Sequence, residues 1–345
     1  MVREIRTPFL WFSQTINGVP KPWKHFEIDG LMVNAYEILQ KNRASLIIKE
    51  KGIHTYLAFS GPIVMDSGGF LFMKKRILDV HPQKILELYD LSKPNFGVVL
   101  DHPLKPNLSN AERKKRQLKT LENTRYMVNS LKGHNPQLIP VIHGHSIQTI
   151  LWYVKKLNQI HEFETYGIGS LVPSVFTSKD AGGIYNVARI VSFVRKLLPN
   201  KKIHVFGVGS ALTMHLMFYL KADSVDSSGW RTKAAFGAIQ LPRVGDRYIT
   251  KKKKHKKYPD LSRSERETLD DCGCPVCRNY PLDSLKKSFQ LRALHNAWVF
   301  QKEVETARKL ITKNDYESYV KEVLTSTPFS NVFKYAAKLK GLRAS

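Results

Sequence analysis

The sequence predicts an α/β protein built as a (β/α)8 barrel of the TIM type, with an N-terminal β cover and a C-terminal zinc-binding subdomain. Two observations predict the barrel. Six short apolar runs each end on a polar residue or a glycine, at residues 63–66, 97–101, 138–144, 166–170, 203–210 and 222–228. Helix-length stretches lie between these runs, at residues 110–131, 149–159, 185–198 and 211–220. This alternation implies parallel βαβ units, and six or more of them favour a closed barrel over an open sheet.

The elements follow one another in a simple order. Residues 1–30 are rich in aromatic residues and proline, which suits strands and turns, and are expected to cover one end of the barrel. Residues 31–245 are expected to form the barrel, with its first strand at 31–38, and the run at 236–241 either completes the barrel or leads out of it. A basic loop and a zinc subdomain occupy 246–300, and residues 301–345 are expected to form helices that pack on the barrel.

The polar residues at the strand ends are the candidate site. In a barrel of this kind the carboxyl ends of the strands share one face, so residues far apart in the chain are expected to converge there. They are Asp66, Asp101, His143, Gly169, Ser170 and Asp226. The clearest of these signals is Met65-Asp66-Ser67-Gly68-Gly69-Phe70. Taken alone, Asp66 and Ser67 could merely cap the next segment, and the two glycines could merely form a turn.

The charge of the chain indicates its partner. The 345 residues include 55 Lys and Arg but only 29 Asp and Glu, which gives a net charge of +26. Such an excess favours a polyanion, since phosphate contacts release counterions, and nucleic acid is the expected partner. An anionic membrane surface is the alternative, but no apolar run of about 18 residues and no signal-peptide pattern occurs. We expect a soluble, cytoplasmic protein with no membrane association.

All three cysteines lie together. Cys272, Cys274 and Cys277 are followed eighteen residues later by His295. Three thiolates and one imidazole complete a tetrahedral zinc site without an open position, as in structural sites. A redox pair or incidental cysteines are weaker alternatives. We therefore expect Zn2+ to stabilise this subdomain, with no organic cofactor.

Several motifs together resemble those of the tRNA-guanine transglycosylase superfamily. GPIVMDSGGF, VVLD, VIHG, YGIGSL, FGVGS, SVDSSGWR, CGCPVC and LHN occur in the order found there, over roughly positions 30 to 310. The family is a modified (β/α)8 barrel with a zinc subdomain, and it exchanges guanine in a polynucleotide for a 7-deazaguanine base. The resemblance also implies zinc on Cys272, Cys274, Cys277 and His295.

The resemblance further implies roles for single residues. Asp226 would be the nucleophile that forms a covalent glycosyl enzyme, and Asp66 the general acid and base. Asp223 could compete for the nucleophile role on sequence alone, although its place at the start of the strand suits a local pairing. The base would be bound by residues at the ends of four strands: Ser67, Asp101, His143, Gly144, Gly169, Ser170 and Leu171.

Departures from the tRNA enzymes suggest a different polymer. Leu71 stands where the family usually has Gln, and His143-Gly144-His145 replaces Gln-Gly-Gly. After the proposed nucleophile, Trp230, Arg231 and Lys233 replace a Pro-Thr-Arg run, and Trp230 could stack on an unpaired base. These features resemble the bacterial and phage enzymes that insert 7-deazaguanine into DNA, which would place the protein in a host cytoplasm if a phage encodes it. Trp230 could instead be a core residue.

Other interpretations remain open. Lys251, Lys252, Lys253 and Lys254 could contact phosphate or simply be solvated. The polymer could be a tRNA loop instead of DNA, or the chain could be an inactive subunit that only binds nucleic acid. The presence of both Asp66 and Asp226 argues against the inactive subunit. The partners expected are thus DNA or tRNA and a free 7-deazaguanine base, with a homodimer as a further possibility.

Overall fold

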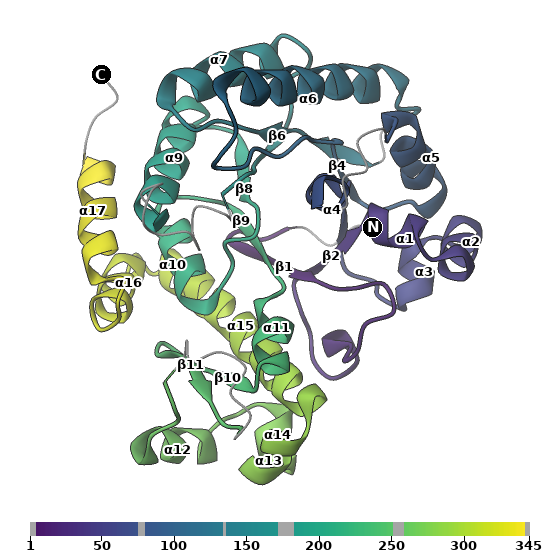
Figure 1. The fold of residues 1–345 in the computed structure, drawn as a ribbon. Helices are drawn as coiled ribbons and strands as arrows, with labels where there is room; N and C mark the ends of the chain where they lie inside the picture. The colour runs from purple at the N-terminus through teal and green to yellow at the C-terminus, as the bar shows by residue number, and fades with distance from the viewer. Residues whose placement is uncertain (1–4, 75–79, 134–135, 172–182, 251–258, 342–345) are drawn as a thin grey trace.

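The computed structural model describes residues 5–74, 80–133, 136–171, 183–250 and 259–341. Nine parallel strands form one sheet in the order β5-β4-β3-β2-β1-β9-β8-β7-β6. Figure 1 shows them as a ring seen end-on, with helices outside it. The strands are β1 (Phe9–Ser13), β2 (Gly30–Asn34), β3 (Ile63–Asp66), β4 (Phe96–Val98), β5 (Gln137–Ile139), β6 (Val141–Ile142), β7 (Thr165–Ile168), β8 (Lys202–Val205) and β9 (Ser224–Ser227).

Pro140 explains why nine strands make an eight-membered barrel. It alone separates β5 from β6, and proline has no N–H to donate to a neighbouring strand. β5 pairs with β4, whereas β6 pairs with β7. β5 and β6 therefore act as one interrupted strand that joins the two ends of the sheet and closes the barrel. The predicted (β/α)8 barrel is confirmed.

The helices of the barrel follow the strands. The four predicted helical stretches correspond to α6, α7, α9 and α10, and Ser109, Ser146 and Ser210 cap three of them through their side chains. The helices in this part of the chain are α1 (Ala35–Leu39), α2 (Asn42–Lys51), α3 (Ile53–Leu57), α4 (Gly69–Lys74), α5 (Pro82–Ser92), α6 (Asn110–Ser130), α7 (Ile147–Asn158), α9 (Gly183–Leu197) and α10 (Ala211–Tyr219). α4 lies inside the ring of strands in Figure 1.

The N-terminal segment is not simply a cover. β1 lies within the barrel sheet and pairs in parallel with both β2 and β9, so that the prediction for residues 1–30 was wrong here. Phe9 and Trp11 fill the barrel interior with other apolar side chains of the strands. An aromatic run such as Phe9–Ser13 suits a buried strand, but only its pairing partners reveal that role. The strand expected at 31–38 ends at Asn34, whose side chain caps α1.

Side chains alternate between the two faces of a strand, and this alternation places polar residues above the apolar side chains that fill the barrel interior. Residues two apart on a strand point to the same side, so Asn34 follows Met32 and Asp66 follows Val64 on the inner face. Asn34 is paired in register with Asp66 on the neighbouring strand. The inner face thus changes from apolar to polar at the carboxyl ends of the strands.

The chain leaves the barrel after α11 (Gly229–Ala235). The run at 236–241 does not complete the barrel, because β10 (Ala238–Leu241) pairs antiparallel with β11 (Gly245–Tyr248) in a separate sheet. Ile239 and Leu241 pack in a second, smaller core with Val276 and Leu285. The expected boundary at 245/246 therefore falls inside this hairpin, which packs with the subdomain. The subdomain also contains α12 (Arg263–Asp270), α13 (Pro275–Asn279) and α14 (Leu282–Lys287).

A long helix joins the two cores. α15 (Phe289–Thr312) begins beside α14 and contacts α11, β10 and β1, so the expected boundary at 300/301 cuts through a continuous helix. α16 (Tyr316–Thr325) packs against α10, and α17 (Ser330–Gly341) packs against α9 (Figure 1). No helix in the described ranges is both long enough and apolar enough to cross a membrane.

Candidate active site and metal centre

Asp66 stands at the end of β3 and is held from two sides. Nδ2 of Asn34 donates a hydrogen bond to Oδ2 of Asp66 at 2.6 Å. The Gly68 N–H also donates to this carboxyl group. Gly68 has a φ of +92°, and a Cβ there would lie 2.6 Å from Cβ of Tyr36, so glycine is required on both counts. Burial, followed by the negative charges of Asp101 and Asp226, raises the pKa of Asp66 to about 8.

Asp226 stands at the end of β9, beside β1 and β8. Its Oδ1 accepts a hydrogen bond from the Gly207 N–H at 2.6 Å, and its Oδ2 accepts one from Oγ of Ser13 at 3.1 Å. Nε2 of His204 lies 3.4 Å from Oδ1. Both oxygens of Asp226 thus accept hydrogen bonds, as carboxylate oxygens can.

Asp101, His143 and Ser170 form a second connected group. Nε2 of His143 lies 2.9 Å from Oδ2 of Asp101, and its Nδ1 lies 2.8 Å from Oγ of Ser170. The same Oγ accepts the Leu104 N–H at 2.8 Å. Ser170 has a φ of +64°, a conformation that is uncommon for residues other than glycine, and its hydroxyl is engaged on both sides.

Glycines allow this group to pack closely. A Cβ at Gly69 would lie 2.0 Å from Oδ1 of Asp101, and one at Gly169 would lie 2.9 Å from Cε1 of His143. Gly144 has a packing role, because a Cβ there would lie 2.3 Å from Cγ1 of Ile150. Four residues predicted to bind the base have buried side chains, namely Ser67, Asp101, His143 and Leu171. The Ser67 hydroxyl donates to the Val99 carbonyl at 3.2 Å, and Leu171 is part of the main core.

One cavity of about 610 Å³ brings the two proposed catalytic carboxyl groups together. Its volume is in the range of small-molecule binding sites. Ser13, Asn34, Asp66, Phe70, Leu71, Asp226 and Arg231 are among its lining residues. Of the six strand-end residues expected to converge, Asp66 and Asp226 therefore share this cavity. Asp101, His143, Gly169 and Ser170 are not among the residues that line it.

The residues predicted to contact nucleic acid differ in their placement. Trp230 is fully buried and packs edge-on against Phe12, so the stacking hypothesis was wrong and the core alternative holds. Nζ of Lys233 lies 2.7 Å from Oδ1 of Asp246, so its charge is balanced within the protein. Arg231 does line the cavity and donates to the Val19 carbonyl at 3.1 Å. The basic run Lys251, Lys252, Lys253 and Lys254 lies outside the described residues.

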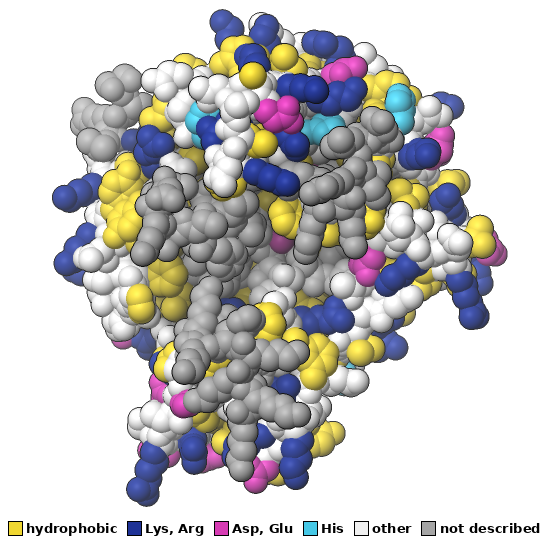
Figure 2. All heavy atoms as spheres, viewed as in Figure 1, with side chains coloured by type: hydrophobic (Ala, Val, Ile, Leu, Met, Phe, Trp, Pro, Cys, Tyr) yellow, Lys and Arg dark blue, Asp and Glu magenta, His cyan; other side chains and the backbone are white. Residues whose placement is uncertain are grey.

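One face of the molecule is rich in cations. Figure 2 shows Lys and Arg side chains spread around this side of the molecule, with Asp and Glu side chains much sparser. Such a distribution attracts a polyanion to this face.

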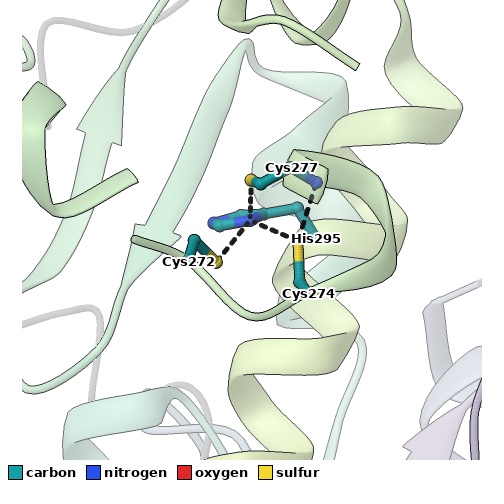
Figure 3. Close-up of side chains that lie close together, drawn as sticks. All are labelled: Cys272, Cys274, Cys277 and His295. Carbon is teal, nitrogen blue, oxygen red and sulfur yellow. Dashed lines mark hydrogen bonds between the residues drawn. The ribbon is translucent and has the colours of Figure 1, made fainter. Parts of the chain in front are cut away.

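Cys272, Cys274, Cys277 and His295 form a compact group in the second core. Nδ1 of His295 lies 3.9, 3.4 and 3.3 Å from the three Sγ atoms in that order (Figure 3). A tetrahedral zinc site with Zn–S of about 2.3 Å and Zn–N of about 2.0 Å has S···N edges of about 3.5 Å. The four ligand atoms also lie within 4.8 Å of one another, so this residue set fits zinc.

The rest of the His295 ring supports the same conclusion. Its Nε2 lies 2.9 Å from the Gln240 carbonyl oxygen, an acceptor only, so Nε2 carries the proton and leaves Nδ1 free to bind a metal. Because Gln240 is in β10, the contact also ties the metal centre to the hairpin.

Three polar residues at the two carboxyl groups were not predicted from the sequence, namely Ser13, Asn34 and His204. Ser13 was missed because its segment was expected to lie outside the barrel. His204 stands between the buried residues Ile203 and Val205, which predicts a strand but does not reveal that its ring faces Asp226.

Comparison with known proteins identifies the family. The family described as queuine tRNA-ribosyltransferase matches residues 2–328. Similar proteins include the tRNA-guanine(15) transglycosylases of Methanococcus aeolicus (26% identical, covering 86% of this chain and 44% of the relative), Pyrococcus furiosus (27%, 90% and 50%) and Archaeoglobus fulgidus (27%, 88% and 60%). The chain spans about half the length of the curated relatives it matches. On the family match over nearly its whole length, the chain belongs to the queuine tRNA-ribosyltransferase family.

Proposed function

We propose that this chain is a guanine transglycosylase that exchanges guanine in a nucleic acid for a free 7-deazaguanine base. One observation carries the proposal: a carboxyl group with a pKa of about 8, Asp66, shares a cavity with Asp226, whose two oxygens accept hydrogen bonds. At neutral pH the first can donate a proton while the second attacks, which is the division of roles needed to cleave a glycosidic bond with retention.

The exchange proceeds in two half-reactions. An Asp226 oxygen forms a bond to C1′ of the nucleotide as the C1′–N9 bond breaks, and the leaving N9 takes the proton of Asp66. The incoming base then gives its N9 proton to the Asp66 carboxylate and attacks C1′. The C1′–O bond breaks and its electron pair returns to Asp226, which regenerates both groups.

The second group of polar residues suits recognition of the base. Asp101 would accept hydrogen bonds from N1–H and the 2-amino group of guanine, as a carboxylate can. The donation from His143 to O6 that the sequence suggested is not available, because its Nε2 faces Asp101 and its Nδ1 faces Ser170. His143 would instead hold these two side chains in place, and the backbone of Gly169, Ser170 and Leu171 would face the 7-substituent. The metal centre would hold a structural Zn2+ that stabilises the second core and α15.

For the polymer, tRNA is favoured over DNA. The relatives described above are tRNA-guanine(15) transglycosylases, and the stacking role of Trp230, which supported DNA, is lost because Trp230 is buried. DNA remains the second candidate because Leu71 and His143-Gly144-His145 depart from the tRNA enzymes. A duplex would in addition require the guanosine to be flipped out, at a cost of a few kcal/mol.

Labelled guanine tests both the reaction and the polymer. We expect the purified protein to incorporate label into unmodified tRNA and to lose that label when 7-deazaguanine bases are added in excess. Duplex DNA is the parallel substrate, and the Asp226→Asn variant is the control for non-enzymatic labelling. Label in DNA but not in tRNA would reverse the choice of polymer, and binding without label in either would favour a non-catalytic subunit.

The raised pKa of Asp66 predicts the pH dependence of guanine release. Asp66 must be protonated to act as an acid, so kcat of the first half-reaction should fall about tenfold per pH unit above about pH 8. Asp101→Asn removes a negative charge that raises the pKa of Asp66. In this variant the falling limb of the profile of kcat against pH should therefore begin at lower pH. Single-turnover guanine release from pH 6 to 10 measures both. A limb that does not move in Asp101→Asn would contradict the stated electrostatic cause.

A further inference from the structure

His204 is a buried histidine with one ring nitrogen unaccounted for. It lies on β8 with only 2% of its surface exposed. Nδ1 lies 2.9 Å from Oγ of Ser224, its register partner on β9. Nε2 lies 3.4 Å from Oδ1 of Asp226 but makes no hydrogen bond of standard geometry. A buried ring nitrogen is therefore directed at the proposed nucleophile.

The surroundings fix both the orientation and the tautomer of the ring. The Phe206 ring packs edge-on against it, with centroids 4.4 Å apart. A carboxylate offers acceptors only, so the proton of a neutral His204 belongs on Nε2, facing Asp226. Nδ1 is then an acceptor, and the Ser224 hydroxyl donates to it. Ser224 thus stabilises the tautomer that presents an N–H to Asp226.

We infer that His204 is a positioning residue for Asp226, an inference that rests on the proposed function. The Gly207 N–H donates to Oδ1 and Nε2 of His204 faces the same oxygen, which leaves Oδ2 as the oxygen that attacks C1′. Oδ2 faces Ser13, which lines the cavity, so the attacking oxygen is on the substrate side. In the glycosyl ester Oδ1 becomes the carbonyl oxygen and keeps the same two donors.

This arrangement affects chemistry more than binding. When the ester is cleaved, negative charge returns to Asp226, and donors already in place on Oδ1 stabilise that charge. His204 is buried and is not among the residues that line the cavity, so its removal should leave KM nearly unchanged. Positioning partners of this kind typically contribute 10- to 100-fold, and we expect a fall in kcat on the order of that size.

Substitutions at His204 and Ser224 in the full chain test the inference. His204→Phe should lower kcat on the order of 10- to 100-fold without raising KM. His204→Gln, whose amide can present an N–H toward Asp226, should recover part of the loss, and Ser224→Ala should cause a smaller fall. His215→Gln is the matched control, because His215 is also fully buried but pairs with Glu303 on α15 and not with either catalytic carboxyl group. It should lower the melting temperature and leave kcat unchanged.

The outcomes separate this inference from the proposed function. Wild-type protein that exchanges no base into either polymer would refute the proposed function itself. Wild-type exchange together with an unchanged kcat in His204→Phe would overturn the role of His204 alone. If His204→Phe is insoluble, kcat is measured for Ser224→Ala and His204→Gln instead. Wild-type kcat in both variants would also overturn the role of His204. Reduced kcat at constant KM would support it.

Discussion

Asp226→Asn is expected to abolish base exchange while the variant remains folded and still binds nucleic acid. An amide oxygen can still accept the Gly207 N–H and the amide nitrogen can face Ser13, so the hydrogen bonds at the end of β9 are largely kept. An amide is, however, too poor a nucleophile to open a glycosidic bond. Loss of the nucleophile in enzymes that act through a covalent intermediate lowers kcat on the order of 10⁴-fold or more.

The measurement is the rate of labelled guanine exchange, together with trapping of a protein–polymer adduct that survives denaturation. Asp223→Asn is the matched control, since Asp223 lies three residues away. Asp223 accepts the Ile203 N–H at 2.8 Å and pairs with Arg195, so its substitution should reduce stability modestly and retain exchange. An adduct formed by Asp226→Asn, or loss of exchange only in Asp223→Asn, would assign the nucleophile elsewhere.

Loss of the metal centre is expected to cost more stability than any single packing change. Apparent binding free energies of structural zinc are about 10–16 kcal/mol in small zinc-folded peptides, comparable with the whole stability of a typical domain. His295 lies on α15. The same helix carries Gln301 and Arg308, whose side chains bind Asp29, the residue just before β2. Damage to the second core should therefore loosen the barrel as well.

We expect one zinc ion per chain by elemental analysis, and Cys274→Ser should yield little soluble, folded protein. Val276→Ala is the control, because Val276 is buried in α13, the short helix that Cys274 caps, but offers no ligand. It should cost on the order of 1–2 kcal/mol and keep the metal. Folded, zinc-free and fully active Cys274→Ser would rule out a structural metal site.

Local signals in the sequence were enough to predict the barrel and the residues that converge in it. An apolar run that ends on Asp66 or Asp226 predicts where that residue lies, because the carboxyl ends of barrel strands meet at one face whatever the details of packing. Cys272, Cys274 and Cys277 are likewise grouped by the chain itself. These features depend on short-range spacing and on the general geometry of parallel strands.

Only the tertiary structure decided which polar and aromatic residues face which neighbours. β1 became a barrel strand because it fits between β2 and β9, and Trp230 became a core residue because α11 packs against α15. His204 meets Asp226 through the register of β8 and β9. Strand pairing, register and burial join residues that are distant in the chain, and the energy that selects them is the packing of the whole molecule, which no local pattern of residues contains.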